Sequence, residues 1–176
     1  MNLKEDKTVS KGIRTALLEL LAEKPYVDIT VTDIVNRAGV ARISYYRHFS
    51  SVNDVVDSIV DELTQRFVNN VLTIVSSKNK EIWVDTLVDF FEFTGEKGNK
   101  YFKNISQSNM SVIFVRVTER LKNILGNFKD GDIEKKYSLA GKLGLIESIA
   151  RHWISCGMKE DPYEMAEYTA EILIRF

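Results

Sequence analysis

Residues 29–49 read ITVTDIVNRAGVARISYYRHF. Thr30 is followed three residues later by Asp33, a spacing that predicts a capping box at the start of a short helix. Gly39 follows the apolar residues of this helix, and glycine tolerates the left-handed conformation that ends many helices. A second short helix is predicted from about Arg42 to His48. Two short helices joined by a glycine-containing turn predict a helix-turn-helix.

Neither short helix is stable alone, so apolar side chains must lock the pair together. Ile34, Val35 and Val40, with Tyr46 or Phe49, are the residues expected to do so. An amphipathic helix over about Thr8–Glu23 precedes them and braces the pair. The outward face of the second helix then carries side chains able to reach base edges and phosphates: Arg42, Ser44, Tyr45, Arg47 and His48.

The charge pattern agrees with a local rather than a global nucleic-acid surface. The formal net charge of the 176 residues is −1, so no overall basic field attracts DNA. Between Asn36 and Phe49, however, the charged side chains are Arg37, Arg42 and Arg47, and no acid interrupts them.

The stretch 29–49 closely resembles the DNA-binding domain of the TetR/AcrR family of bacterial repressors. The resemblance lies in the order T-V-x-x-I-x-x-x-A-G-V followed by S-Y-Y-x-x-F, and it extends over about Lys7–Leu63. It implies an N-terminal three-helix reader, a connecting fourth helix and a helical effector and dimerisation body. The later H-W-I-x-x-G, with Pro162 and Glu164, is similar to the variant body of Gram-positive members.

The resemblance also implies roles for individual residues. Arg42, Ser44 and Tyr45 would face the major groove, with Arg47 beside them. Tyr46 and His48 would hold phosphates. Thr30 would place its helix N-terminus at the DNA backbone. Two alternatives stay open: Arg42 as an ordinary surface arginine, and Tyr46 as a core aromatic.

Three positions depart from the family pattern. Val52 stands where a lysine is frequent, Ala41 where a capping serine is frequent, and Ile43 where a small residue or proline is frequent. These departures concern the affinity for DNA and the DNA sequence that is preferred, and they do not change the predicted class of protein.

The rest of the chain predicts an all-α body and about nine helices in total. A long helix starts near Asn53, and a break is expected over Gly95–Gly98. The expected elements after it are a short helix around Tyr101, Phe102 and Ile105, a loop over Gly126–Asp132, and two closing helices, about Glu134–Cys156 and from Asp161–Pro162 onward. We therefore divide the chain into a helix-turn-helix domain, residues 1–52, and a ligand-binding and dimerisation domain, residues 53–176.

Aromatic residues gather in the body at helical spacing, which is typical of a plain core or of a pocket for an apolar ligand. Because of the family resemblance we expect a pocket. Its expected lining is Trp83, Phe90, Phe91, Tyr101, Phe102, Met110, Phe114 and Trp153.

The two closing helices are amphipathic, and Gly141 and Gly144 would allow close helix approach. Two such helices from each of two copies would form a four-helix interface, and a dimer would set two reading helices about 34 Å apart. Burial inside one subunit is the alternative. The expected interface residues are Leu139, Leu143, Ile146, Ala150, Met165, Thr169, Ile172 and Leu173.

Other chemistry has little support in the sequence. His152 and Cys156 share a helix face at a spacing able to hold a metal, but two ligands are too few alone. Ser44 and His48 also share a face, without a readable acid partner. We expect no enzyme activity, no cofactor and no metal. The single cysteine, the polar start and the lack of about 18 consecutive apolar residues predict a cytoplasmic protein without a membrane partner.

The function predicted is that of a ligand-responsive repressor that binds a palindromic operator as a homodimer. Its partners would be double-stranded operator DNA, a second copy of the chain and an unidentified small molecule. The alternative is a helical interaction or activator protein of the same fold that lacks repressor function. An interaction protein that has lost DNA binding would account for Val52 and Ala41. An activator would differ from a repressor only in whether the ligand strengthens or weakens DNA binding, and the sequence pattern is the same for both.

Overall fold

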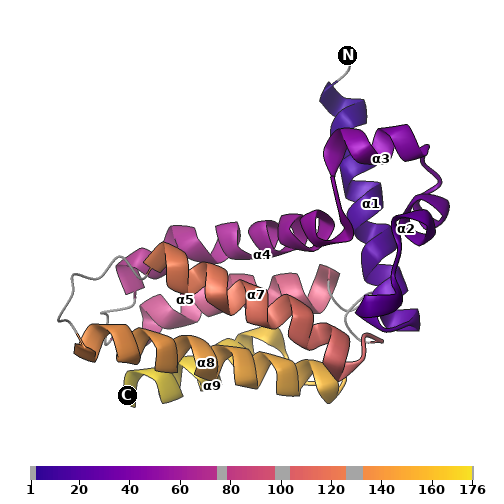
Figure 1. Cartoon of the computed structure of the whole chain (residues 1–176). Helices are drawn as coiled ribbons and strands as arrows, with labels where there is room; N and C mark the ends of the chain where they lie inside the picture. The colour runs from indigo at the N-terminus through magenta and orange to yellow at the C-terminus, as the bar shows by residue number, and fades with distance from the viewer. Residues whose placement is uncertain (1–2, 75–78, 98–103, 126–132, 176) are drawn as a thin grey trace.

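The computed structural model describes residues 3–74, 79–97, 104–125 and 133–175. Within these ranges the chain forms eight α-helices, one 3₁₀ turn, one π-helical turn and no strand. The predicted fold class is confirmed: a three-helix N-terminal domain stands at one end of a long helix, and a helical body lies along it (Figure 1).

The N-terminal domain consists of α1 (Leu3–Glu23), α2 (Val31–Ala38) and α3 (Arg42–His48), with a 3₁₀ turn at Tyr26–Asp28. Helix α1 buries one apolar stripe, as its spacing predicts. Ile13, Leu17 and Leu21 are at most 1% exposed and pack with Ile34 of α2. Each such buried side chain contributes about 1.5–3 kcal/mol relative to an exposed one.

The start and end of α2 follow the predicted local chemistry. The Thr30 hydroxyl accepts the backbone N–H of Asp33 at 3.2 Å, and the Asp33 carboxylate accepts the Thr30 backbone N–H at 2.8 Å. Gly39 adopts φ 66°, the left-handed conformation. The start of α2 is therefore fixed by Thr30 and Asp33, and the turn after it begins at Gly39.

Helix α4 (Val52–Ile74) links the two parts of the molecule. Its 23 residues span about 34 Å at 1.5 Å per residue. The body adds α5 (Lys80–Glu92), α7 (Gln107–Leu125), α8 (Ile133–Ser155) and α9 (Pro162–Arg175). α7 packs against α4 and α8, and α9 packs against α5. In Figure 1, α8 and α9 lie lowest, on the side away from α4.

The middle of the body differs from the sequence prediction at the end of α5. The expected break at Gly95 is wrong, because α5 continues into a π-helical turn over Phe93–Lys97. Gly95 lies close to the core there: a Cβ at this position would lie 3.2 Å from the Trp153 ring, closer than an ordinary van der Waals contact. Tyr101 and Phe102 of the expected short helix lie outside the described residues, whereas Ile105 is described and lies in a bend. The expected loop at 126–132 also lies outside them.

Among the helices described, none has the length and apolar character needed to cross a bilayer.

Candidate nucleic-acid interface and body cavity

Helix α3 is held to the domain by two aromatic residues one helical turn apart. Tyr45 is 0% exposed and Phe49 is 7% exposed, and their ring centroids lie 6.0 Å apart. The expectation that Tyr45 faces the major groove is therefore wrong. Its side chain points into the core, and Tyr46, the alternative core aromatic, is 50% exposed instead. The spacing of four residues between Tyr45 and Phe49 was the signal for this arrangement.

The buried hydroxyl of Tyr45 has no hydrogen-bond partner among the described residues. Burial raises the pKa of Tyr45 to about 12, with a further contribution from the nearby Asp54 carboxylate. The phenol therefore stays neutral, and the unsatisfied O–H is a local cost to stability.

The outward face of α3 carries Arg42, Ile43, Tyr46 and Arg47, all exposed. The Arg42 guanidinium donates to the Tyr46 hydroxyl at 3.5 Å and lies 5.8 Å from the centre of its ring. This face combines cationic and hydroxyl donors with one apolar side chain. Such groups can bind phosphates, guanine edges and thymine methyls.

The remaining proposed contacts flank this face. Ser44 and His48 are half-buried on α3. Thr30 is exposed at the N-terminus of α2, where its side chain is engaged with Asp33. Ile43, which was not predicted to contact DNA, is 73% exposed on this face. Its position directly after Arg42 was the available signal.

Arg37 belongs to the scaffold rather than to the exposed basic face. Its guanidinium donates to Glu23 at 2.9 and 2.6 Å and lies 3.6 Å from Glu19. The hydrogen bond from Arg37 lowers the pKa of the Glu23 carboxyl. The two acids neutralise the arginine, so the local positive charge rests on Arg42 and Arg47.

The structure shows local consequences at two of the unusual positions. Ala41 is the N-cap of α3 and supplies no side-chain acceptor to the first N–H groups of that helix. Val52 is partly buried and packs against the core at the start of α4. Neither side chain can bind a phosphate.

One buried asparagine ties the body to the N-terminal domain. Asn109 on α7 is 3% exposed, and its amide donates to the carbonyls of Leu21 and Lys24, both at 2.8 Å. Its carbonyl accepts the backbone N–H of Tyr26 at 2.9 Å. The end of α1 and the turn after it are thus fixed to the start of α7.

Two arginines extend this attachment along α4. Arg116 of α7 donates to Asp57 at 2.7 Å and to Asn53 at 2.6 Å. Arg120, one turn further along α7, pairs with Asp61. Because Asn109, Arg116 and Arg120 of α7 all bind the N-terminal domain or α4, a shift of α7 would also displace those elements.

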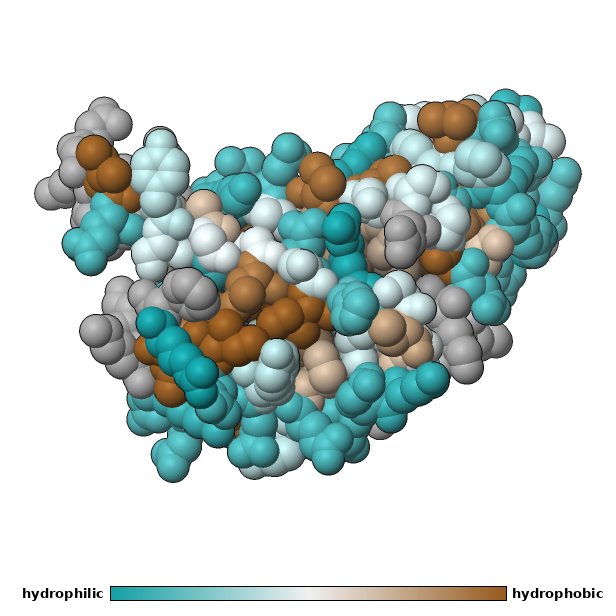
Figure 2. Space-filling view, turned by 90° about the horizontal axis from the view of Figure 1, so that it is seen from below, coloured by the Kyte–Doolittle hydropathy of each residue, from teal (hydrophilic) through white to brown (hydrophobic). Residues whose placement is uncertain are grey.

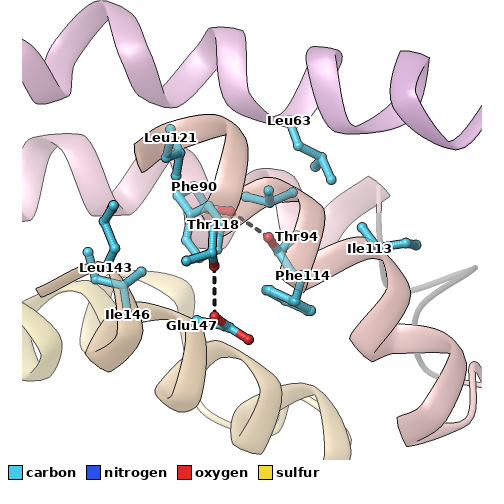
Figure 3. Close-up of a pocket in the computed structure, with 11 residues that line it drawn as sticks. Leu63, Phe90, Thr94, Ile113, Phe114, Thr118, Leu121, Leu143, Ile146 and Glu147 are labelled. Carbon is cyan, nitrogen blue, oxygen red and sulfur yellow. Dashed lines mark hydrogen bonds between the residues drawn. The ribbon is translucent and has the colours of Figure 1, made fainter. Parts of the chain in front are cut away.

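A cavity lies between α4, α5, α7 and α8 (Figure 3). Its volume is about 40 Å³, enough for a few water molecules and too small for a typical ligand. The described residues around it are Leu63, Phe90, Thr94, Ile113, Phe114, Val117, Thr118, Leu121, Leu143, Ile146 and Glu147.

The predicted pocket residues divide into three groups. Phe90 and Phe114 line the cavity. Trp83, Phe91 and Met110 are core residues at most 4% exposed and are not part of the lining of this cavity, and Trp153 lies beside a different groove. Tyr101 and Phe102 lie outside the described residues. The periodicity of apolar residues identifies the buried side of a helix. It does not show where the packing of several helices leaves a cavity.

Most of the predicted dimer residues are buried within the single chain, so they cannot form an interface with a second copy. This correction applies to six residues that are at most 5% exposed: Leu139, Leu143, Ile146, Ala150, Thr169 and Leu173. Met165 and Ile172 are only partly buried. The spacing identified the amphipathic helices correctly but assigned their inner face to the interface.

The outer face of α8 and α9 has a different composition. Gly141, Gly144 and Ser148 are exposed on α8, and Tyr168 is 60% exposed on α9. A groove of about 550 Å³ runs between the helices, lined by Ile149, Met165 and Tyr168 among others. Seen from this side, hydrophobic residues gather in a hollow of the body (Figure 2).

His152 and Cys156 both line this groove, with 3.6 Å between Nε2 and Sγ. In the part of the chain that is described, no group of three or more His, Cys, Asp or Glu residues comes together as metal ligands would.

The N-terminal domain matches a known family of proteins. Residues 13–59 match the family model "Bacterial regulatory proteins, tetR family". This range includes α2, α3 and the start of α4, and it confirms the resemblance inferred from the motif. The match ends at residue 59, so the similarity of the body to that of Gram-positive members stays a prediction.

Solved structures with the same overall fold cover nearly the whole chain. FadR from Bacillus halodurans, a fatty acid degradation regulator, aligns with a TM-score of 0.63 and 18% identity, over 93% of this chain and 97% of that chain. FadR from Bacillus subtilis, solved with stearoyl-CoA, gives 0.60 and 20% over 93% and 97%. The dihydroxyacetone kinase operon activator DhaS gives 0.60 and 19% over 95% and 94%. At these identities the similarity shows the fold alone.

Proposed function

From the tetR-family match of its N-terminal domain, we propose that this chain is a sequence-specific DNA-binding transcriptional regulator, acting as a ligand-responsive repressor on a palindromic operator. The observation that carries the proposal is the division of α3 into two faces. Tyr45 and Phe49 anchor the helix from within, while Arg42, Tyr46 and Arg47 stand exposed on the other side. A short helix held in this way is rigid enough to enter a major groove.

The proposed contacts follow from exposure and chemistry. Arg42 and Ser44 read base edges, with Arg47 beside them. Tyr46 and His48 bind phosphates, and Thr30 brings the N-terminus of α2 to the DNA backbone, where its partial positive charge favours a phosphate. Residues 1–52 form the reading unit in this proposal, and residues 53–176 form the ligand-binding and dimerisation unit.

We place the dimer on the outer face of α8 and α9. Exposed Gly141, Gly144 and Ser148 permit close approach of a second helix, and Ile149, Met165 and Tyr168 of the adjacent groove supply apolar surface to bury. A twofold interface there leaves both N-terminal domains available at the other side of the body, as the placement of α8 and α9 in Figure 1 allows.

Ligand control would pass through α7. This helix lines the cavity with Ile113, Phe114 and Thr118, and it holds α1 and α4 through Asn109 and Arg116. A ligand that widens the cavity therefore alters the position of the reading domain, provided that it binds the two states with different affinity. Among proteins of this fold, FadR of Bacillus subtilis holds stearoyl-CoA and DhaS is an operon activator.

Selection of genomic DNA fragments by the purified protein tests the proposal. The expected result is enrichment of a sequence with twofold symmetry, whose half-sites lie one helical turn or a multiple of it apart. Repeating the selection with metabolite extract tests ligand control. Equal recovery of all fragments would contradict the proposal and favour a protein-interaction role.

A further inference from the structure

The cavity in the body is apolar apart from a single polar corner. Leucine, isoleucine, valine and phenylalanine side chains from four helices surround it, and the polar groups along its described lining are Thr94, Thr118 and Glu147. In Figure 3, Thr118 and Glu147 face one another across the gap between α7 and α8. Any ligand here must place its polar group at this corner.

The hydrogen-bond donors at that corner are already committed. The Thr118 hydroxyl donates to Glu147 Oε2 at 2.7 Å, and the Thr94 hydroxyl donates to the Phe90 carbonyl at 2.8 Å. Carboxylate and hydroxyl oxygens retain lone pairs when they accept or donate one bond. Among the described lining residues, the corner therefore offers acceptors and no uncommitted side-chain donor. The ligand must supply the donor.

The charge of the corner narrows the choice further. Glu147 is the charged residue of the described lining, and its side chain is 20% exposed. The nearest cation is Arg151, whose Nη1 lies 3.9 Å from Glu147 Oε1. Arg151 is 45% exposed and also donates to Ser111 at 3.3 Å. It therefore approaches the Glu147 carboxylate from the solvent side and not from the cavity. A ligand carboxylate or phosphate placed in the cavity would meet a like charge.

An ammonium group fits both requirements. It carries three N–H donors and a positive charge, and a charge-assisted hydrogen bond to a carboxylate is stronger than a neutral one. The apolar walls then require an apolar body on the same molecule. We propose that the ligand of this cavity is an apolar amine, whose ammonium group binds Glu147. Binding of the amine does not depend on the proposed function. Only the expectation that the amine controls DNA binding rests on it.

The cavity must widen to accept such a molecule. Its volume of about 40 Å³ is far below the roughly 300 Å³ of the smaller ligand pockets in proteins. Widening moves α7 relative to α5 and α8, since these three helices supply most of the lining. The structure with this small cavity is thus the closed state in this proposal.

Three compounds with the same ten-carbon chain test the head group directly: decylamine, decanol and decanoate. Isothermal titration calorimetry of the intact protein, without DNA and below the micelle concentration of each compound, gives three dissociation constants. We expect decylamine to bind at least about tenfold more tightly than decanol, the difference made by one charge-assisted hydrogen bond, and decanoate to bind most weakly. This comparison needs no variant.

A matched pair of variants then locates the head group. Glu147→Gln removes the charge at the corner and should abolish the preference for decylamine over decanol. Glu134→Gln removes the same charge from an exposed position in the first turn of α8 and should leave the preference unchanged. Circular dichroism confirms that both variants are folded.

Each outcome has a definite meaning. Decanoate binding as tightly as decylamine, an unchanged preference in Glu147→Gln, or no binding of any of the three compounds overturns the inference. Because the titration contains no DNA, its result is separate from the selection of operator fragments. Amine binding without an operator would leave the inference standing and refute the proposed function.

Discussion

The side-chain amide of Asn109 donates a 2.8 Å hydrogen bond to the backbone carbonyl of Leu21, joining the body to the last turn of α1 across 88 positions of sequence. The same amide also bonds the Lys24 carbonyl, and its oxygen accepts from Tyr26. A single side chain thus satisfies three backbone groups at the boundary between the reading domain and the body.

Replacement of this residue should be costly. Asn109→Ala leaves the three backbone groups without their partner in a buried site, and we expect a loss of about 2–4 kcal/mol in the free energy of unfolding. Urea denaturation at neutral pH measures it. Asn123→Ala, at an exposed position of the same helix, is the control and should change stability by less than about 0.5 kcal/mol. Equal effects would show that the bonds of Asn109 do not hold the domains together.

The adjacent tyrosines of α3 should respond in opposite ways to loss of their hydroxyl groups. Tyr45→Phe removes a buried, unsatisfied O–H and should stabilise the protein by about 1 kcal/mol without changing operator affinity. Tyr46→Phe removes an exposed hydroxyl, and should leave stability unchanged while weakening operator binding. Thermal unfolding and fluorescence anisotropy with operator DNA separate the two effects. If Tyr45→Phe weakened operator binding and Tyr46→Phe did not, the assignment of Tyr45 to the buried face of α3 and of Tyr46 to its DNA-binding face would be contradicted.

The capping box of α2 predicts a pH-dependent effect. Thr30→Ala should cost about 1 kcal/mol of stability at pH 7. In the folded protein, hydrogen bonds from Lys24 first, and then from Thr30, hold the pKa of Asp33 well below its usual 3.8. Its stabilising contribution is therefore complete above pH 4 and is lost as the pH falls below that value.

The cost of Thr30→Ala should stay the same between pH 7 and pH 4, because Asp33 of the folded protein is ionised throughout this range and keeps the bonds of the box. It should shrink only at a pH well below 3.8, where Asp33 becomes protonated in the folded protein as well. Urea denaturation at a series of pH values from 7 downward measures the change, and a cost that already falls between pH 7 and pH 4 would contradict this role of Asp33.

The position of the dimer interface can be tested at Gly144. A Cβ at this exposed residue meets nothing within 4 Å in the single chain, so Gly144→Arg fits the isolated subunit. If a second copy covers this face, the arginine should separate the dimer. Light scattering should then report the 20.2 kDa mass of one chain instead of twice that value.

Gly12→Arg on α1, where an added Cβ also meets no atom within 4 Å, serves as the control and should remain dimeric. A dimeric Gly144→Arg protein would place the interface elsewhere. A wild-type protein that is already monomeric at micromolar concentration would remove the dimer from the proposal.

Local chemistry made the helix-turn-helix predictable from sequence. The cap formed by Thr30 and Asp33 and the left-handed Gly39 depend on residues close in the chain, and both are confirmed. The buried stripe of α1 follows from spacing alone. The family motif then named the class of domain, which residues 13–59 confirm.

Features set by distant contacts could not be derived in this way. Arg37 reads as part of a basic patch until α1 brings Glu19 and Glu23 beside it. Asn109 carries no motif, since its partners are backbone groups more than 80 positions away. Thr118 and Glu147 meet only because α7 packs on α8, so the polar corner of the cavity is invisible in sequence.

The buried and exposed faces of single helices could be predicted only in part. Tyr45 and Phe49 share a face by spacing, so the burial of Tyr45 was within reach. On α8, apolar residues identified the buried side correctly, but whether a neighbouring helix or a second copy buries it depends on the rest of the fold.

Operator binding by two arginine variants of one segment tests the central claim most directly. Arg42 stands exposed on α3, whereas Arg37 is paired with Glu19 and Glu23. Fluorescence anisotropy should show that Arg42→Ala loses at least about tenfold in affinity for the selected operator and discriminates less against unrelated DNA. Arg37→Ala should bind both DNAs as the wild type does. Unchanged operator affinity in Arg42→Ala would contradict the account.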